Sequence, residues 1–426
     1  MIRDILQLRG KIFRLGLPAL VSRGSLVLWG LFSILIVRAL PKEAYAAYAV
    51  ARSIQIFGLM LGGGFVMQAV TKFTAEGDTD REKRITNASI VLAMATAATV
   101  AAAIIALGGP LQSFYSDIDL RGIPWALALL VLSSATASLP HSILMARHRM
   151  VRMMVADVSS VLVRIAVVAY FLLSGRLTSP LQVFGAMIAG GVVATVIGMA
   201  FAWRHVEPAL GFERQHLAKL FGFSVVTLGS GLAANIYART DILLLGKLAG
   251  EEETSGYSAC RTLTAMADML LNAAKMVMLP LISRMWSSGR RSEVMRRVMG
   301  SILIVSLIQL PLVVAFALFP GRLLNLLFDG KYDAASPVLM ILGLLMLAKP
   351  FGSMFACLTA AIGKPSFALY GVVTSAAVNV GLNLLLIPAY GALGAAVATA
   401  FSVVMGAAVI AVLAVRRMRL EINATS

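Results

Sequence analysis

The sequence predicts an all-α membrane protein with about twelve transmembrane helices. These are expected to form two six-helix bundles related by a pseudo-twofold axis along the membrane normal. Three observations lead to this prediction. The chain of 426 residues has 59% hydrophobic and only 13% charged residues, too few to coat a soluble surface of that size. Apolar runs of membrane-spanning length recur along the chain, and short motifs recur at about half its length.

The apolar runs give the expected helices, because each is long enough to cross a hydrocarbon core of about 30 Å. The longest polar connection between them, 203–217, leaves no room for a soluble domain, so function is expected within the membrane region. The first run follows a basic arm and lacks a small-residue cleavage site, so it predicts a retained helix. The expected helices lie near 15–38, 46–70, 87–109, 124–145, 153–174, 180–202, 220–246, 256–282, 298–319, 335–359, 367–388 and 391–415.

The formal net charge of +17 is explained by membrane topology and not by nucleic acid binding. With the N-terminus in the cytoplasm, the connections on that side and the two termini carry 23 Lys and Arg residues, against seven on the opposite side. This asymmetry follows the positive-inside rule and predicts that both termini are cytoplasmic.

Motifs for enzymatic chemistry are lacking. The sequence has no Walker lysine loop and no Rossmann glycine pattern, and its four histidines have no metal-ligand spacing. Its two cysteines both fall within predicted helices and define no redox compartment. We therefore expect neither an enzyme nor a bound cofactor or metal.

Two motifs recur at nearly the same offset. YAVAR at 48–52 returns as YSACR at 257–261, and GGVVAT at 190–195 returns as GAAVAT at 394–399. Chance similarity among small apolar residues is the alternative, but the first motif includes an arginine, which is costly inside a membrane. An even number of spans in each copy gives both copies one orientation. The predicted domains are an N-terminal six-helix lobe, 1–217, and a C-terminal six-helix lobe, 218–426.

Charged residues inside the predicted helices indicate a polar cavity. A charge near the bilayer centre costs at least about 2.5 to 3.5 kcal/mol, so such a residue is expected to face a wet interior or a partner. Basic residues outnumber acidic ones, which favours an anionic ligand, and the arginine fork suits phosphate oxygens. The basic residues are Arg23, Arg52, Arg164, Arg239, Arg261, Lys275 and Lys349, and the acidic ones are Asp157, Asp241 and Asp268.

A stripe on one predicted helix defines the candidate site. Arg261, Asp268 and Lys275 are spaced by seven residues, which places them on one helix face together with Asn272. The alternative for the arginines and lysines nearest the helix ends is snorkelling to the interface. We predict that a lipid-linked diphosphate is bound by Arg23, Arg52, Arg239, Arg261 and Lys275, and that Asp157, Asp241 and Asp268 are candidates for ion coupling.

Glycine and proline residues predict flexible points in two helices. Gly62, Gly63 and Gly64 interrupt the second predicted helix, and Pro18 lies in the first. Such breaks permit bending near transport pathways, although close packing also explains them. We expect these four residues to act as hinges.

Three segments resemble a known family. LNLLLIPAYGALGAAVATAFS (382–402) is similar to the C-terminal signature of polysaccharide flippases in the multidrug/oligosaccharidyl-lipid/polysaccharide exporter superfamily. ALPKEAYAAYAVARS (39–53) and RTDILLLGKLAGEEETSGYSACR (239–261) resemble the helix junctions of its two halves. The resemblance covers nearly the whole chain.

The resemblance implies a two-lobed transporter working by alternating access. Its substrate would be an undecaprenyl-diphosphate-linked oligosaccharide, moved from the cytoplasmic to the periplasmic leaflet of the bacterial inner membrane for O-antigen, capsule or exopolysaccharide synthesis. Polysaccharide polymerase or export machinery would be partners. In the related lipid II flippases, arginines on helices 1, 2 and 8 line the central cavity, and Arg23, Arg52 and Arg261 match those positions. Three alternatives remain open, namely a cation-coupled drug exporter, a lipid II flippase and a scaffold of a glycan assembly complex.

Overall fold

The computed structural model describes the chain except for residues 1–16, 65, 68–70, 72–78, 204–213 and 424–426. All regular secondary structure in the described residues is helical, which confirms the predicted all-α class. The chain divides into two compact units, Met1–Leu232 and Ala233–Ser426. The boundary falls inside helix α10, Arg214–Leu248, so that helix belongs partly to each unit. The predicted division into lobes at 217/218 stays a prediction.

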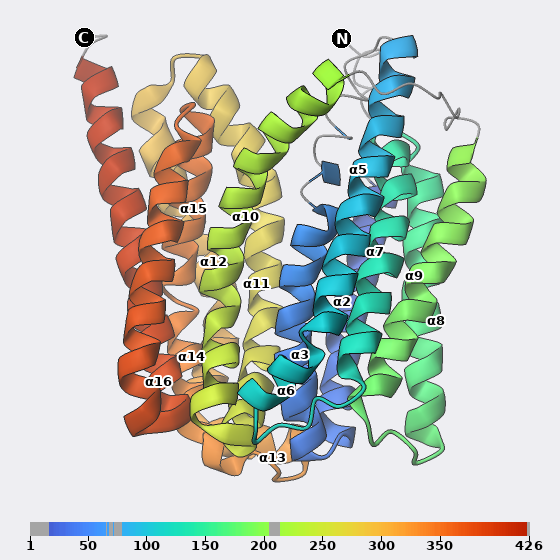
Figure 1. Cartoon of the computed structure of the whole chain (residues 1–426). Helices are drawn as coiled ribbons and strands as arrows, with labels where there is room; N and C mark the ends of the chain where they lie inside the picture. Colours follow the sequence, from blue (N-terminus) through green and yellow to red (C-terminus); the bar gives the residue numbers. More distant parts are fainter. Residues whose placement is uncertain (1–16, 65, 68–70, 72–78, 204–213, 424–426) are drawn as a thin grey trace. The chain divides into compact units, whose positions relative to one another are not determined.

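Unit 1 is built from long helices that pack side by side (Figure 1). Helix α9 contacts both α7 and α8, and α5 contacts α7. A local signal marks the start of α9. At α9, the Ser179 hydroxyl accepts from the Leu181 amide at 3.3 Å and Gln182 closes the capping box, with Pro180 at the first helical position. The helices are α2 (Leu17–Ala39), α3 (Lys42–Leu59), α5 (Thr79–Ala106), α6 (Gly108–Phe114), α7 (Ile123–Ala146), α8 (Met150–Leu173), α9 (Pro180–Ala202) and the first part of α10.

A break follows α3 at the glycine triplet. The π-helical turn η2, Met60–Gly64, contains non-helical backbone at Gly62 and Gly63, and Gly63 has a positive φ of 103°. A Cβ on Gly62 would lie 2.7 Å from Val131 Cγ1, and one on Gly63 would lie 3.0 Å from the Ala93 carbonyl oxygen. Only glycine fits both the conformation and the space. The predicted interruption is therefore present, and its action as a hinge stays a prediction.

Unit 2 consists of the remainder of α10 and the helices that follow. A buried apolar cluster near one end joins α11, α12, α15 and α16, with Ile282, Val298 and Leu358 among its fully buried members. The elements are α11 (Gly250–Ser287), α12 (Arg291–Leu318), α13 (Pro320–Phe328), η4 (Asp333–Ala335), α14 (Ser336–Leu345), α15 (Lys349–Ala361) and α16 (Pro365–Asn423).

Helix α16 is two helical stretches joined by a turn. The backbone leaves the helical conformation at Gly391, with φ 52° and ψ −132°, three residues after Pro388. The Ala392 amide donates to Glu253 Oε2 at 2.7 Å, so a carboxylate from α11 caps the second stretch. A Cβ on Gly391 would lie 2.6 Å from the same oxygen. The turn therefore depends on a glycine and on a residue 138 positions earlier in the chain.

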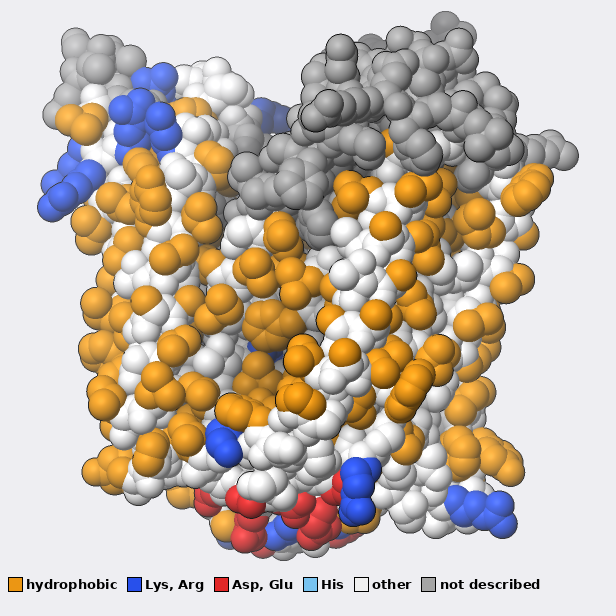
Figure 2. All heavy atoms as spheres, in the orientation of Figure 1, with side chains coloured by type: hydrophobic (Ala, Val, Ile, Leu, Met, Phe, Trp, Pro, Cys, Tyr) orange, Lys and Arg blue, Asp and Glu red, His pale blue; other side chains and the backbone are white. Residues whose placement is uncertain are grey.

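The helices have the length and composition of membrane spans. Within the described part of the chain, nine helices are long and apolar enough to cross a membrane. The expected count of twelve is not confirmed, and α16 enters this count once although it turns at Gly391. Hydrophobic side chains cover the flanks of the helices and charged ones gather towards their ends (Figure 2). The chain is a multi-pass membrane protein.

Candidate functional site

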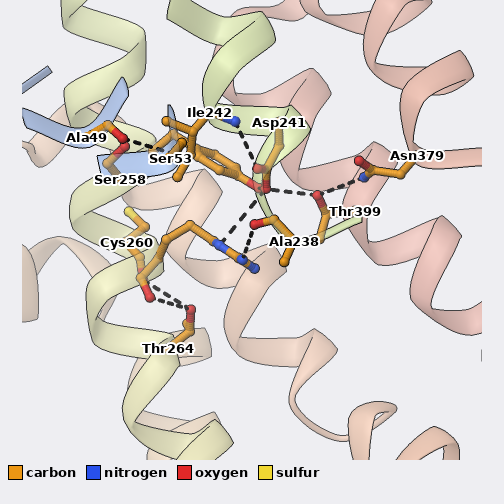
Figure 3. Close-up of polar contacts among 12 residues, drawn as sticks. Ala49, Ser53, Ala238, Asp241, Ile242, Ser258, Cys260, Thr264, Asn379 and Thr399 are labelled. Carbon is orange, nitrogen blue, oxygen red and sulfur yellow. Dashed lines mark hydrogen bonds and ion pairs between the residues drawn. The ribbon is translucent and has the colours of Figure 1, made fainter. Parts of the chain in front are cut away.

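Unit 2 contains a buried polar cluster centred on Asp241 of α10. The Tyr257 hydroxyl, from α11, donates to Asp241 Oδ2 at 2.5 Å, and the Ile242 amide donates to Oδ1 at 2.8 Å. The Arg261 Nε atom lies 4.0 Å from Oδ2. Figure 3 shows Asp241 close to Ile242, Ala238 and Thr399. Because the Asp241 side chain is only 1% exposed, these partners replace water as its solvation. The carboxylate is therefore held in place by the tyrosine and the arginine of YSACR, the second copy of the repeated motif.

Two further helical stretches close this cluster. The Tyr257 hydroxyl also lies 3.2 Å from Thr399 Oγ1, and the Asn379 amide donates to the same oxygen at 3.3 Å. Asn383 in turn donates to Asn379 at 2.9 Å. Arg261 donates from Nη2 to the Ala238 carbonyl at 3.2 Å. The network ties α10 and α11 to both stretches of α16, and it includes the threonine that ends the repeated GAAVAT motif.

A cavity of about 400 Å³ lies beside this network within unit 2. Lys349 donates from Nζ to Asp268 at 2.7 and 3.0 Å, forming an ion pair at its wall. Lys275 also lines the cavity, and among the described residues no carboxylate lies within 4.0 Å of its ammonium. The polar lining consists of Tyr237, Arg261, Asp268, Asn272, Lys275, Lys349, Ser353 and Ser375.

The predicted stripe on α11 is part of this wall. Arg261, Asp268, Asn272 and Lys275 all line the cavity, as their spacing on one helix face requires. The charges are mostly compensated, since Asp241 neighbours Arg261 and Asp268 binds Lys349. Lys275 therefore supplies the uncompensated positive charge of this wall.

Unit 1 contains a second charged cluster, around Asp157 of α8. Ser22 of α2 donates to Asp157 Oδ2 at 2.5 Å, and His141 Nδ1 of α7 lies 3.2 Å from Oδ1. The Asp157 and His141 side chains are 23% and 38% exposed, so water reaches both. Sequence reasoning missed His141 because only metal-ligand spacing was sought. Its position within an apolar run, where ionisable residues are rare, was the available signal.

Arg164 lies two turns further along α8 and packs against the first repeated glycine motif. A Cβ on Gly190 would lie 2.5 Å from Arg164 Cγ, so the glycine makes room for the arginine stem. Arg164 interacts electrostatically with Asp157 and with Arg52 of α3. Its Nε atom is buried and has no hydrogen-bond partner among the described residues. Unit 1 thus brings together two of the predicted intramembrane arginines and one of the predicted acids.

The remaining predicted residues to be located are Arg23, Arg239 and Pro18. The Arg23 side chain lies outside the described residues, although its backbone belongs to α2, as does that of Pro18. Arg239 is half-buried in α10. Within the described ranges, no group of three or more His, Cys, Asp or Glu side chains is arranged to hold a metal ion.

The chain matches a known family model over most of its length. The model, described as polysaccharide biosynthesis protein, covers residues 35–337. The chain belongs to this family. The resemblance read from the three sequence segments is therefore confirmed.

Two curated relatives of this chain come from archaea. It is 24% identical over 234 residues to the probable low-salt glycan biosynthesis flippase Agl15 of Haloferax volcanii, covering 55% of the chain and 48% of that protein. It is 27% identical over 217 residues to an uncharacterized membrane protein of Methanocaldococcus jannaschii, covering 50% of the chain and 42% of that protein. The matches thus span less than half the length of each relative.

Solved structures with the same fold are known. An inward-facing multidrug resistance transporter of the MOP superfamily matches with a TM-score of 0.78 at 15% identity, covering 97% of this chain and 99% of that one. The lipid II flippase MurJ, in an inward closed conformation, matches with a TM-score of 0.73 at 12% identity, covering 92% and 86%. A MOP superfamily transporter from Pyrococcus furiosus matches with a TM-score of 0.63 at 18% identity, covering 97% and 95%. The relatives named here with an activity are transporters or flippases, not enzymes.

Proposed function

We propose that the chain is a flippase that moves a polyprenyl-diphosphate-linked oligosaccharide between the leaflets of a membrane. The observation that carries this proposal is the polar cavity in unit 2, where Lys275 has no carboxylate partner among the described residues. Membership of the polysaccharide biosynthesis family and the likeness to Agl15 support a glycan as the group transported.

The charge of the cavity wall favours an anion. Asp241 offsets the charge of Arg261, and Asp268 offsets that of Lys349, which leaves Lys275 in excess. A phosphate oxygen is a strong acceptor for an ammonium group, and the interaction gains strength where water is scarce. Asn272, Ser353 and the other hydroxyl and amide groups of the lining offer hydrogen bonds to sugars.

The carrier lipid, the membrane and the product of the proposal follow from the family resemblance, while the binding residues and the topology follow from the charge pattern of the sequence. The lipid would be undecaprenyl diphosphate, the membrane the bacterial inner membrane, and the product an O-antigen, capsule or exopolysaccharide. Arg23, Arg52 and Arg239 would join Arg261 and Lys275 in binding the diphosphate. Both termini would lie in the cytoplasm, and polysaccharide polymerase or export machinery would receive the product.

Ion coupling is proposed at the intramembrane acids. Asp157 has a histidine partner, His141, and histidine is the side chain that most readily changes charge between pH 5 and 8. Asp268 lines the cavity and 41% of its side chain is exposed, whereas the Asp241 side chain is only 1% exposed. We propose that Asp157 and Asp268 are the acids best placed to exchange a proton during transport.

Flipping in proteoliposomes tests the proposal. The probe is a short prenyl-diphosphate disaccharide, whose appearance in the outer leaflet is followed with an added sugar-modifying enzyme. Substitution Lys275→Gln removes the excess cation, and we expect the flipping rate to fall about tenfold or more, since a hydrogen bond to a charged group contributes roughly 1.5–3 kcal/mol.

The matched control is Lys364→Gln, which removes a lysine between α15 and α16 that does not line the cavity. The control should flip the probe at the wild-type rate. Normal flipping by Lys275→Gln would contradict the proposed role of the cavity. Failure of the wild-type protein to flip the probe, with export of a cationic drug instead, would favour the drug-exporter alternative.

A further inference from the structure

A second cavity of unit 2 lies at the turn between α11 and α12. It has a volume of about 340 Å³ and is separate from the cavity described above, with no lining residue in common. Its wall combines three arginines with apolar side chains. The lining residues that matter here are Arg290, Arg296, Arg297, Leu281, Met285 and Ile304.

The arginines of this cavity exceed its acidic charge. Arg290 donates to both Glu293 oxygens, at 3.2 and 2.8 Å, and Arg296 Nη2 lies 3.8 Å from Glu293 Oε2. For Arg297, no carboxylate lies within 4.0 Å in the described part of the chain. Three guanidinium groups thus face one carboxylate, and a guanidinium fork matches the oxygens of a phosphate.

The apolar part of the wall continues as an exposed face of α12. Leu303, Ile304, Leu307 and Ile308 are 56–60% exposed, and Ile304 also lines the cavity. A contiguous exposed aliphatic patch marks a surface for lipid or protein contact, and on a helix of membrane-spanning length lipid chains are the apolar surroundings available to it. The cavity therefore lies where the apolar flank of α12 gives way to its basic end.

A nearby aromatic residue supports the position of the cavity at the boundary between lipid chains and headgroups. The Arg291 guanidinium lies 5.0 Å from the centroid of the Trp286 ring. Tryptophan is enriched at the headgroup level of membranes, where its ring is half in lipid and half in water. The two neighbours of the cavity therefore have the character of interfacial residues.

We propose that this cavity binds the phosphate headgroup of an anionic membrane lipid, whose acyl chains lie along the exposed face of α12. A free phosphate would use the arginines but would gain nothing from the aliphatic face. A lipid uses both. This site is separate from the substrate cavity, and lipid binding there does not depend on the proposed flippase activity.

Binding of phosphatidylglycerol to the purified full chain tests the inference. Dissociation constants are measured by native mass spectrometry from a zwitterionic detergent, with phosphatidylcholine of the same acyl chains as the neutral comparison. We expect Arg296→Gln/Arg297→Gln to weaken phosphatidylglycerol binding about 25-fold, at roughly fivefold for each arginine removed. Phosphatidylcholine binding should not change.

Two further variants keep the test decisive. Glu293→Gln removes the competing carboxylate and should tighten phosphatidylglycerol binding about fivefold. Arg416→Gln/Arg419→Gln removes two exposed arginines of α16 that do not line the cavity, and it should leave binding unchanged. An equal loss in this control pair would show general attraction to a basic surface and overturn the site.

Competition distinguishes the source of the phosphate. Inorganic phosphate at millimolar concentration should not displace the lipid, because it lacks acyl chains. Complete displacement would show a site for free phosphate and overturn the lipid assignment.

Discussion

At the scale of single residues, the YSACR segment at 257–261 has a structural explanation. Its tyrosine and arginine are four residues apart, so they project from the same face of α11. Both contact Asp241, through a hydrogen bond of 2.5 Å from Tyr257 and an ion pair of 4.0 Å with Arg261. The partly buried arginine is therefore stabilised by a carboxylate within its own unit.

Removal of that carboxylate charge should destabilise the protein. Asp241→Asn keeps an acceptor for Tyr257 but leaves Arg261 without a counter-ion. We expect the free energy of unfolding to fall by about 3 kcal/mol, the lower end of the range for breaking a buried pair. Denaturant unfolding in detergent, followed by tryptophan fluorescence, measures this change.

Two comparisons separate the effect from a general loss of charge. Asp119→Asn breaks an exposed pair with Arg121 and should change the unfolding free energy by less than about 1 kcal/mol. Asp241→Asn/Arg261→Gln should recover part of the loss, because the two residues are coupled. An unfolding midpoint of Asp241→Asn equal to that of the wild type would contradict the assigned pair.

The ion pair between Lys349 and Asp268 is a part of the site that the sequence could not provide. Spacing along α11 placed four polar residues on one face, because helical periodicity is local. Lys349 and Asp268 are 81 positions apart, and only packing brings α15 against α11. The excess of basic residues inside the spans was visible in the sequence, but its neutralisation depends on contacts between helices.

At the scale of elements, the helices followed from apolar runs, while their interruptions followed from proline and glycine. The expected helices at 367–388 and 391–415 meet at the turn that α16 makes at Gly391. The expected helix at 335–359 is instead two helices, since α14 ends at Leu345 and α15 begins at Lys349. Pro350, in the first turn of α15, was the available signal, because proline favours a helix start and disrupts a helix interior.

Substitution of the turn glycine should destabilise unit 2. Gly391→Ala adds a Cβ at a positive φ, only 2.6 Å from Glu253 Oε2. We expect a loss of about 2 kcal/mol or more in the free energy of unfolding, from backbone strain and from displacement of the cap on Ala392. Denaturant unfolding in detergent, followed by tryptophan fluorescence, measures this loss.

Gly381→Ala is the matched control within α16. A Cβ there meets no other atom within 4 Å, so the change should be neutral or slightly stabilising through higher helix propensity. Equal effects of the two substitutions would mean that the turn does not require glycine.

At the scale of the whole molecule, the chain is a multi-pass membrane protein of the polysaccharide biosynthesis family. Its fold class and family were predictable, because composition and family motifs are properties of the sequence itself. The substrate was not, because sugar recognition by hydroxyl and amide groups leaves no characteristic spacing. The excess of basic residues in alternate connections predicts which ends of the helices face the cytoplasm.

Cysteine labelling in spheroplasts measures this topology. Ser288→Cys, in the turn after α11, should react only with a reagent that reaches the cytoplasm, and Arg176→Cys, after α8, should react from outside. Both residues are exposed, and the native Cys260 and Cys357 are buried, so background labelling should be low. Labelling of the two positions from the same side would contradict the predicted orientation.

Proton exchange at Asp268, as proposed above, would give the unit 2 cavity an adjustable charge. While the carboxylate is ionised, it cancels the lysine, and the wall presents one excess cation at Lys275. A single proton added to Asp268, whose side chain is 41% exposed, would leave Lys349 as a second cation in the same space. The cavity could then hold a doubly charged group in one protonation state and release it in the other.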